Sequence, residues 1–360
     1  MDTQLSETQQ LIQNSIREYL EKEVPFSRIR EVERTGGMDS DLWASLAAQG
    51  WLGLPFREDL GGQGGDLTDS GVLVEELTRR AVLVPIAETL ACAATIQKFG
   101  AEALAAEVAA GVQSGTMTLT PAILEEGDSF ADIAMQVSGG TVSGRKYFVD
   151  YGAEVSHHLV AARGEDGLGL YLVENDAQVS HRSLANIGKI PQSVATYANR
   201  PARRVCGEDG VLFLKRLGRL FATVQCLGCS QQALDMTVEY VGMRVQFGRP
   251  IGSFQAVKHH CANMATHVLA TRYLTYEGLY DLDHGQVTDT QIAVAKTEAS
   301  RTATEVPMLA HQLHGGMGFV TEYDLHFFSL RGKQASLTWG TAEECLADVA
   351  RTIEEETEWL

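Results

Sequence analysis

The hydrophobic pattern of the chain changes twice, near residues 116 and 205, and these changes limit its fold more than any other feature. Before the first change and after the second, apolar residues recur at the three- or four-residue spacing of amphipathic helices. Between them, short apolar runs are divided by Gly, Asp and Ser, which is typical of β-strands. We therefore predict an α+β fold with an N-terminal helical domain (1–115), a middle β-barrel-like domain (116–205) and a C-terminal four-helix bundle (206–360).

The same periodicity places individual elements. The first helix is expected after Ser6, because Ser6 and Gln9 form a capping-box pattern. Pro307 is expected to kink the helix that contains it. The predicted helices cover residues 42–46, 70–80, 87–99, 219–243, 254–283, 289–313 and 342–356. The predicted strands cover residues 117–120, 134–137, 146–149, 158–162 and 169–173.

Composition excludes several classes of protein. A formal net charge of -18 over 360 residues argues against a nucleic-acid surface, which needs a concentrated basic footprint. No window approaches the roughly 18 apolar residues of a membrane span, and no leader pattern is present, so a cytoplasmic protein is expected. Cys226 and Cys229 form a C-x-x-C within a helical pattern that lacks a second ligand pair, so we predict core cysteines and no metal site.

One candidate site follows the first long C-terminal helix, where residues 244–255 read Arg-Val-Gln-Phe-Gly-Arg-Pro-Ile-Gly-Ser-Phe-Gln. Arg244 is a permanent cation whose planar fork suits a pyrophosphate. Gly248 and Gly252 allow the backbone to turn between two helices. The alternative interpretation is a polar connection with an incidental arginine.

A second candidate site is the glycine-rich segment 312–323, Gln-Leu-His-Gly-Gly-Met-Gly-Phe-Val-Thr-Glu-Tyr. A helix must stop there at a residue that tolerates positive φ, and backbone without side chains can then lie against a cofactor. A helix stop alone explains one glycine better than three.

Both segments resemble signatures of the acyl-CoA dehydrogenase family. Gly340-Thr341 lies at the ungapped spacing from Thr321 at which that family begins its last helix. Looser similarity at 50–62 and 143–152 extends the resemblance over almost the whole chain. The resemblance implies the acyl-CoA dehydrogenase fold, FAD as cofactor, an acyl-CoA substrate and an electron-transferring flavoprotein as electron acceptor. The residues that it places on FAD are Arg244, Gln246, Phe247, Phe254, Gln255, Gln312, Gly315, Gly316 and Thr341.

The sequence departs from the family at the catalytic base. In that family a glutamate removes the α-proton of the thioester while the flavin accepts a hydride. Most members place this glutamate where this chain has Trp339, and a minority place it where this chain has Gly218, before Arg219. Neither residue can act as a base, so the catalytic residue is unknown from the sequence.

Other polar groups near these segments have weaker claims. Asp150 takes the place of a threonine whose hydroxyl usually lies near the flavin ring, and Thr120 is expected to remain a flavin contact. Glu344 is predicted to cap a helix with Thr341 rather than to act as a base. Four histidines are expected to be satisfied surface or interface groups: His259, His260, His311 and His314.

The chain retains the segments that resemble nucleotide contacts but lacks the catalytic base. This combination suggests that two subunits contribute different parts of one active site. The sequence predicts a base-lacking subunit of a heterotetrameric (α2β2) acyl-CoA dehydrogenase, resembling bacterial enzymes of steroid side-chain type. A homologous subunit would then hold the catalytic glutamate. Two alternatives stay open: a homotetramer with another reaction on a CoA ester, such as monooxygenation or a lyase or hydratase reaction, and a catalytically silent stabilising subunit.

Overall fold

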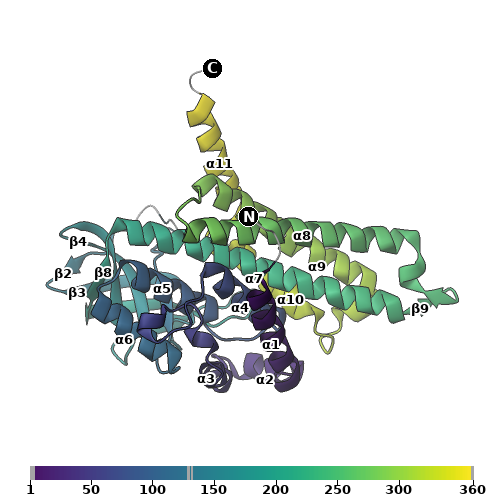
Figure 1. Cartoon of the computed structure of the whole chain (residues 1–360), viewed down its shortest axis with the longest axis horizontal. Coiled ribbons are helices and arrows are strands. Elements are labelled where there is room, and N and C mark those ends of the chain that lie inside the picture. Colours follow the sequence, from purple (N-terminus) through teal and green to yellow (C-terminus); the bar gives the residue numbers. More distant parts are fainter. Residues whose placement is uncertain (1–4, 128–129, 131–132, 358–360) are drawn as a thin grey trace. The chain divides into compact units, whose positions relative to one another are not determined.

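The computed structural model describes residues 5–127, 130 and 133–357 (Figure 1). It divides into two compact units, each considered by itself. Unit 1 comprises Met1–Ile29, Gly71–Val82 and Arg219–Leu360, and unit 2 comprises Arg30–Ser70 and Leu83–Gly218. The three-domain division expected from the sequence stays a prediction.

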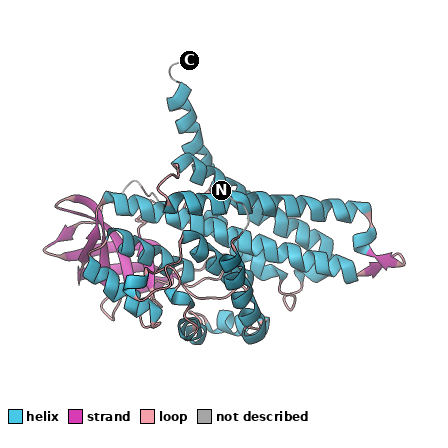
Figure 2. Ribbon diagram, in the orientation of Figure 1, coloured by secondary structure: helices cyan, strands magenta, loops and turns pink. Residues whose placement is uncertain are grey.

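Unit 1 is helical, apart from one small hairpin (Figure 2). The capping box at the start of its first helix is confirmed: the Gln9 amide N–H donates to Ser6 Oγ (3.2 Å), and the Ser6 amide N–H donates to Gln9 Oε1 (3.0 Å). The helix α9 continues through Pro307, which is buried, and a kink at this residue stays a prediction. The elements that lie wholly or largely in unit 1 are α1 (Glu7–Glu23), α4 (Leu67–Arg79), α7 (Glu208–Met243), β9 (Val245–Gln246), β10 (Arg249–Pro250), η3 (Ile251–Ser253), α8 (Gln255–Asp283), α9 (Asp289–His314), η4 (Gly315–Phe319), α10 (Leu325–Leu337) and α11 (Ala342–Thr357).

Unit 2 combines short helices with two four-stranded sheets, ordered β1-β4-β5-β8 and β2-β3-β7-β6. Both sheets contribute to one apolar core, which includes Val160 and Tyr171 from the first sheet and Val142 and Tyr197 from the second. The helical elements are α2 (Phe26–Thr35), α3 (Ser40–Ala48), η1 (Trp51–Gly53), η2 (Glu58–Leu60), α5 (Ile86–Phe99) and α6 (Glu102–Gln113). The strands are β1 (Leu119–Ala122), β2 (Val137–Ser138), β3 (Thr141–Asp150), β4 (His157–Gly164), β5 (Gly167–Glu174), β6 (Ser180–Ser183), β7 (Gln192–Pro201) and β8 (Arg203–Cys206).

Several elements differ from the prediction: α2, α6, β6 and β8 lie outside the predicted ranges, and three further differences have a clear physical reason. The helix α7 begins eleven residues before the expected residue 219, since it starts at Glu208. The helix α10 was not expected, because its buried face includes Arg331, Gly332 and Ser336, so no clean apolar stripe marks it. The strand β7 was not expected because polar residues such as Gln192 and Ser193 fill its buried positions.

Two glycines bring α4 close to its neighbours in unit 1. A Cβ at Gly228 on α7 would lie 2.9 Å from the Glu75 backbone oxygen and 2.9 Å from Thr78 Cβ. A Cβ at Gly71 would lie 2.6 Å from Leu279 Cδ1 on α8. Glycine at both positions therefore lets the helices pack more closely than a larger side chain would allow.

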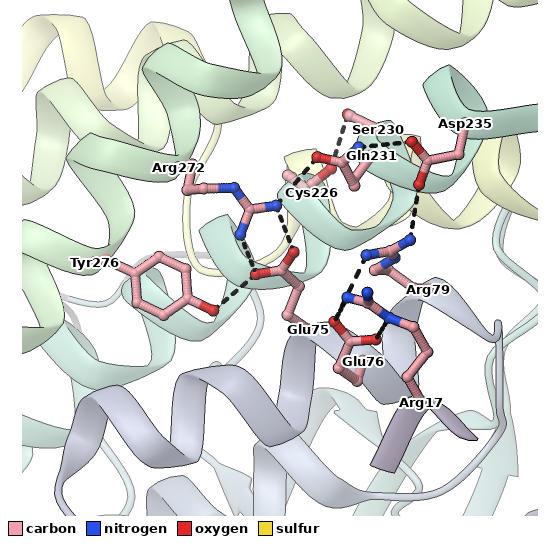
Figure 3. A network of polar contacts seen from close by, with 10 residues as sticks. All are labelled: Arg17, Glu75, Glu76, Arg79, Cys226, Ser230, Gln231, Asp235, Arg272 and Tyr276. Carbon is pink, nitrogen blue, oxygen red and sulfur yellow. Dashed lines mark hydrogen bonds and ion pairs between the residues drawn. The ribbon is translucent and has the colours of Figure 1, made fainter. Parts of the chain in front are cut away.

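The same helix carries a buried ionic network (Figure 3). Arg272 on α8 forms a two-pronged ion pair with Glu75 at 2.7 and 2.8 Å, and the Tyr276 hydroxyl donates to Glu75 at 2.7 Å. Glu76 pairs in the same two-pronged way with Arg17 of α1 at 2.6 and 2.9 Å. Both carboxylates are buried. Paired and hydrogen-bonded charges of this kind fix the register of α4 against α1 and α8.

The cysteines of the C-x-x-C pair lie in the core of unit 1, as predicted, since both Cys226 and Cys229 are buried and free. Burial raises the pKa of the Cys226 thiol to about 11, which keeps it protonated and unreactive at neutral pH. Within the described ranges, no group of three or more His, Cys, Asp or Glu side chains is arranged to hold a metal ion. No helix among the described residues is both long enough and apolar enough to cross a bilayer.

Candidate nucleotide-binding site

The first candidate segment forms a short hairpin between α7 and α8. The strands β9 and β10 pair in antiparallel register, and the turn between them uses left-handed backbone at Phe247 (φ 54°) and Gly248 (φ 77°). Arg244 and Gln246 are exposed, and 92% of the Phe247 side chain is exposed. The hairpin, labelled at β9 in Figure 1, therefore carries an exposed cation, an exposed amide and an exposed aromatic ring.

The hairpin is held in this shape by contacts around Phe254. The rings of Phe247 and Phe254 meet edge to face with centroids 6.1 Å apart, and the Arg249 guanidinium lies 4.2 Å from the Phe254 ring centroid. The amide of Ile251 donates to the Arg244 carbonyl at 2.8 Å. These contacts order the segment in the chain by itself.

The start of α8 adds a second feature that favours an anion. The helix begins at Gln255, and among the described residues no side chain caps its N-terminus. Its first backbone N–H groups and the positive end of its dipole are therefore available at the end of the hairpin that begins at Arg244. A pyrophosphate is a suitable ligand for such a combination.

The second candidate segment ends α9 and forms the turn η4. Gly315 has φ 57° and ψ -137°, a conformation suited to glycine, and it lies exposed together with Gln312 and Gly316. A Cβ built at Gly315 or Gly316 would find no atom within 4 Å. The backbone of this turn is thus open on its outer side and can lie directly against a ligand.

The structure brings the two segments to the same end of unit 1. The Tyr240 ring, one helical turn before Arg244, stacks on the His314 ring at 4.4 Å between centroids, and its hydroxyl donates to the His314 carbonyl at 3.3 Å. Gly315 follows His314 directly. The hairpin and the glycine turn are therefore joined through one aromatic contact that the sequence did not reveal.

The position of the missing base is also well ordered. Trp339 has left-handed backbone (φ 63°), and its carbonyl accepts a hydrogen bond from Arg219 Nε at 3.0 Å. Lys296 is buried and donates to the carbonyls of Ala335 and Ser336 at the end of α10, both at 2.9 Å. Two cations thus fix the turn that carries Trp339, but no carboxylate occupies position 339 or 218.

Thr341 is committed to the start of α11. Its amide donates to Glu344 Oε2 at 2.7 Å, and its hydroxyl oxygen accepts from the Glu344 amide at 3.2 Å. This reciprocal pair confirms the predicted capping box. The part that Thr341 plays toward FAD stays a prediction.

Both predicted histidines of α9 have partners on both ring nitrogens. His311 contacts the Gly318 carbonyl at 2.8 Å and Ser329 Oγ at 3.0 Å. His314 contacts the Ala310 carbonyl at 2.7 Å and the Tyr323 hydroxyl at 3.0 Å. Burial lowers the pKa of both imidazoles, which favours the neutral form.

A separate group of polar side chains lies in unit 2, where the sequence places the flavin-ring strand. Thr120 donates its hydroxyl hydrogen to the Asp150 carbonyl at 2.7 Å, and Gln192 donates to Asp150 Oδ1 from the facing strand at 2.7 Å. Glu88 on α5 lies close enough to Asp150 for the charge of the Asp150 carboxylate to affect the pKa of Glu88. Burial raises the pKa of Asp150 to about 6, and burial together with Asp150 raises the pKa of Glu88 to about 8.

The sequence alone did not reveal this pair of carboxyl groups. Glu88 lies in an ordinary helical pattern, and its partner is 62 residues later in the chain. The Thr120 hydroxyl hydrogen is engaged by the Asp150 carbonyl, and a carboxylate stands where the family resemblance implies a hydroxyl near the flavin ring. The expected contact of Thr120 with the flavin stays a prediction.

Comparisons with known proteins agree with this geometry. The family model of the acyl-CoA dehydrogenase N-terminal domain matches residues 6–116, and that of the C-terminal domain matches residues 215–354. The acyl-CoA dehydrogenase IpdE2 of Mycobacterium tuberculosis is 32% identical over 326 residues, which cover 89% of this chain and 87% of that protein. The chain belongs to the acyl-CoA dehydrogenase family, whose members are flavoprotein oxidoreductases acting on CH–CH bonds of acyl-CoA thioesters.

Solved structures extend the similarity to steroid-type enzymes. A variant of the Tcur3481-Tcur3483 steroid acyl-CoA dehydrogenase is 31% identical with a TM-score of 0.90, covering 97% of this chain and 98% of that chain. The ChsE4-ChsE5 complex from Mycobacterium tuberculosis is 27% identical with a TM-score of 0.91, covering 99% of both chains. The predicted fold and the steroid-type resemblance are confirmed by these matches.

Proposed function

We propose that this chain is a cytoplasmic subunit of a heteromeric, FAD-dependent acyl-CoA dehydrogenase and that it contributes nucleotide contacts to a site completed by a homologous subunit. The observation that carries the proposal is the exposed hairpin beside the exposed glycine turn, with Arg244, Phe247 and Gln312 facing away from unit 1. These groups fit the adenosine and pyrophosphate parts of FAD. A ring that is 92% exposed is also an unusual surface residue unless a partner covers it.

The chain's own catalytic position supports the same division. Proton removal from the α-carbon needs a base, and neither Trp339 nor Gly218 offers one. In unit 2 the Thr120 hydroxyl is committed to the Asp150 carbonyl. We infer that the sister subunit supplies the glutamate and the contacts to the flavin ring.

FAD, when bound, supplies the hydride acceptor for α,β-desaturation of the acyl-CoA. In this chain Arg244 would neutralise the pyrophosphate, and the uncapped start of α8 would donate backbone hydrogen bonds to it. Gln246 and Gln312 would orient the nucleotide through their amides. The remaining nucleotide contacts that we propose are Phe247, Phe254, Gln255, Gly315, Gly316 and Thr341.

Similarity to relatives supports the substrate and the electron acceptor that we propose. The steroid acyl-CoA dehydrogenase with 31% identity favours a bulky acyl-CoA thioester of steroid side-chain type. An electron-transferring flavoprotein is the acceptor that the family favours. A chain from a structure of the electron-transferring flavoprotein of Acidaminococcus fermentans resembles this one, with a TM-score of 0.90 and 25% identity.

The test compares the chain purified alone with the chain co-purified with a homologous subunit from the same organism. We expect the complex to carry FAD and to lose flavin absorbance when acyl-CoA is added. The chain alone is expected to do neither. Full flavin content and turnover by the isolated chain would instead indicate a self-sufficient enzyme. A complex that turns over equally well after the FAD contacts of this chain are removed by substitution would indicate a stabilising subunit.

The contribution of this chain to the site is tested with Arg244→Gln in the complex. Loss of a charge-assisted pyrophosphate contact should weaken FAD binding by roughly tenfold or more. Arg182→Gln is the matched control, since Arg182 is an exposed arginine on β6 of unit 2. Equal FAD affinity for wild type and Arg244→Gln would refute the proposed role.

A further inference from the structure

His314 belongs to the glycine-rich segment and contacts Tyr240, one helical turn before the hairpin segment begins at Arg244. Its ring stacks on Tyr240 near the end of α7, with an interplanar angle of 24°. Its own carbonyl accepts the Tyr240 hydroxyl, and its backbone continues into Gly315. With 3% of its surface exposed, His314 does not face a ligand itself.

The hydrogen bonds of His314 define the tautomer of its neutral ring. A carbonyl oxygen can only accept, so the contact with Ala310 O at 2.7 Å requires a proton on Nδ1. In the neutral ring Nε2 is then an acceptor, and the Tyr323 hydroxyl donates to it at 3.0 Å. The imidazole therefore links the last turn of α9 to the segment that follows η4.

His311 closes the other side of the turn. It bonds the Gly318 carbonyl and the Ser329 hydroxyl, and its ring stacks on Phe319 at 5.3 Å between centroids. His311 thus ties the turn η4 to α10. The hairpin end of α7 is joined to this region by the stack of Tyr240 on His314, with centroids 4.4 Å apart, and by an edge-on contact of the Tyr240 ring with the Tyr323 ring at 6.4 Å. His314 makes the closer ring contact and also accepts the Tyr240 hydroxyl at its carbonyl, so it is the principal link between the glycine turn and the residues that precede Arg244.

We propose that His314 is a positioning residue that couples the hairpin at Arg244 to the glycine turn at Gly315, so that both engage one nucleotide together. The proposal rests on the nucleotide-binding function proposed above and assigns a role to a residue that would not contact FAD. Because the His314 ring connects α7, α9 and the Tyr323 segment, its loss leaves each half of the site intact but no longer aligned with the other.

The experiment is a double-mutant cycle on FAD affinity in the co-purified complex. His314→Phe keeps the ring stack on Tyr240 and removes both side-chain hydrogen bonds. We expect it to weaken FAD binding by roughly three- to tenfold, as for the loss of neutral hydrogen bonds. In the double variant that carries His314→Phe and Arg244→Gln, the loss of FAD affinity should be at least about threefold smaller than the product of the two single losses. The reason is that alignment of the two segments matters less once one of the two contacts with the nucleotide is gone.

A second variant tests the same coupling with less risk to folding. Tyr240→Phe removes only the hydroxyl that donates to the His314 carbonyl, and we expect a smaller loss of FAD affinity with the same non-additivity toward Arg244→Gln. The matched control is His284→Phe. The His284 ring stacks on the Tyr280 ring, with centroids 4.0 Å apart, and His284 Nδ1 bonds the Tyr280 carbonyl oxygen. His284 is the C-cap of α8, and these contacts involve neither nucleotide segment.

The outcomes separate this inference from the proposed function. If Arg244→Gln leaves FAD affinity unchanged, the nucleotide-binding function itself fails. If Arg244→Gln weakens binding but His314→Phe and Tyr240→Phe leave it at the level of wild type and His284→Phe, the coupling role alone is wrong. Losses that multiply without interaction would also overturn the coupling role, because a merely structural defect acts independently of Arg244.

Discussion

Arg219 Nε donates a hydrogen bond to the carbonyl oxygen of Trp339 at 3.0 Å, and Arg219 Nη1 pairs with Asp348 at 2.9 Å. The contact joins the two places at which the family usually carries its catalytic glutamate, because Gly218 precedes Arg219 in α7. The scaffold that would hold a base is therefore intact on both sides. Only the carboxylate is absent.

We predict that Trp339→Glu does not make this chain an independent dehydrogenase. A carboxylate at position 339 would restore the base, but Thr120 and Asp150 in unit 2 would still fit a flavin ring poorly. The measurement is flavin absorbance of the isolated variant on addition of acyl-CoA, with Trp339→Phe as the control. Substrate-dependent bleaching in Trp339→Glu alone would show that the missing glutamate was the sole deficit.

The carboxyl pair of unit 2 should make folding stability fall as pH rises. The pKa of Asp150 is raised to about 6 and that of Glu88 to about 8, so between about pH 4 and pH 8 the folded chain binds more protons than the unfolded chain. Stability contributed by the protonated forms is present at low pH and is lost as pH rises through these values. Asp150→Asn and Glu88→Gln should each stabilise the protein by about 1–2 kcal/mol at pH 8.

Urea unfolding at several pH values checks this prediction. Either variant should flatten the pH dependence, whereas Glu165→Gln, an exposed carboxylate in unit 2, should leave it unchanged. A wild-type stability that increases steadily from pH 5 to pH 8, with no change in the variants, would contradict the assigned pKa shifts.

Removing one charge of the buried network should be costly. In Glu75→Gln the Arg272 guanidinium and the Tyr276 hydroxyl lose their buried carboxylate (Figure 3), and we expect a loss of about 3 kcal/mol in the free energy of unfolding. Glu31→Gln, which breaks the exposed pair with Arg34, should cause no measurable change. Similar urea midpoints for the two variants would mean that the network contributes little.

Two glycines of α7 should respond to alanine in opposite directions. Gly228→Ala places a Cβ 2.9 Å from the Glu75 backbone oxygen and should destabilise unit 1 by about 1–3 kcal/mol. Gly242→Ala meets no atom within 4 Å and should stabilise the helix by about 0.5–1 kcal/mol. Thermal unfolding of both variants tests the contrast, and a stabilised Gly228→Ala would show that α4 can move away from α7.

The sequence predicted well those features that depend on local pattern. The long helices, the capping boxes at Ser6 and Thr341 and the buried C-x-x-C all follow from residue spacing over a few turns, and the structure confirms them. The helix α10 lacks such a pattern because Arg331, Gly332 and Ser336 interrupt its buried face. Its place in the fold is set by tertiary contacts that no local window contains.

The candidate site also depends on contacts between residues that are far apart in the sequence, and these could not be predicted. The hairpin and the glycine turn were visible as motifs, but Tyr240 gives no signal that it stacks on His314, 74 residues later. Glu88 and Asp150 are 62 residues apart and lie in unrelated patterns. Such pairings depend on how α7, α9 and the strands pack, and an isolated sequence does not report distances between segments.

The exposed ring of Phe247 makes occupancy of the hairpin measurable without any enzymatic assay. Whatever covers this ring binds the folded chain and not the unfolded one, so it raises the unfolding temperature by mass action, and the rise grows with the logarithm of its concentration relative to its Kd. The unfolding temperature of the chain then depends on which partners and ligands are present in the sample and at what concentration. A series of unfolding curves with added subunit or nucleotide would therefore rank candidate partners by how strongly each one shifts the midpoint.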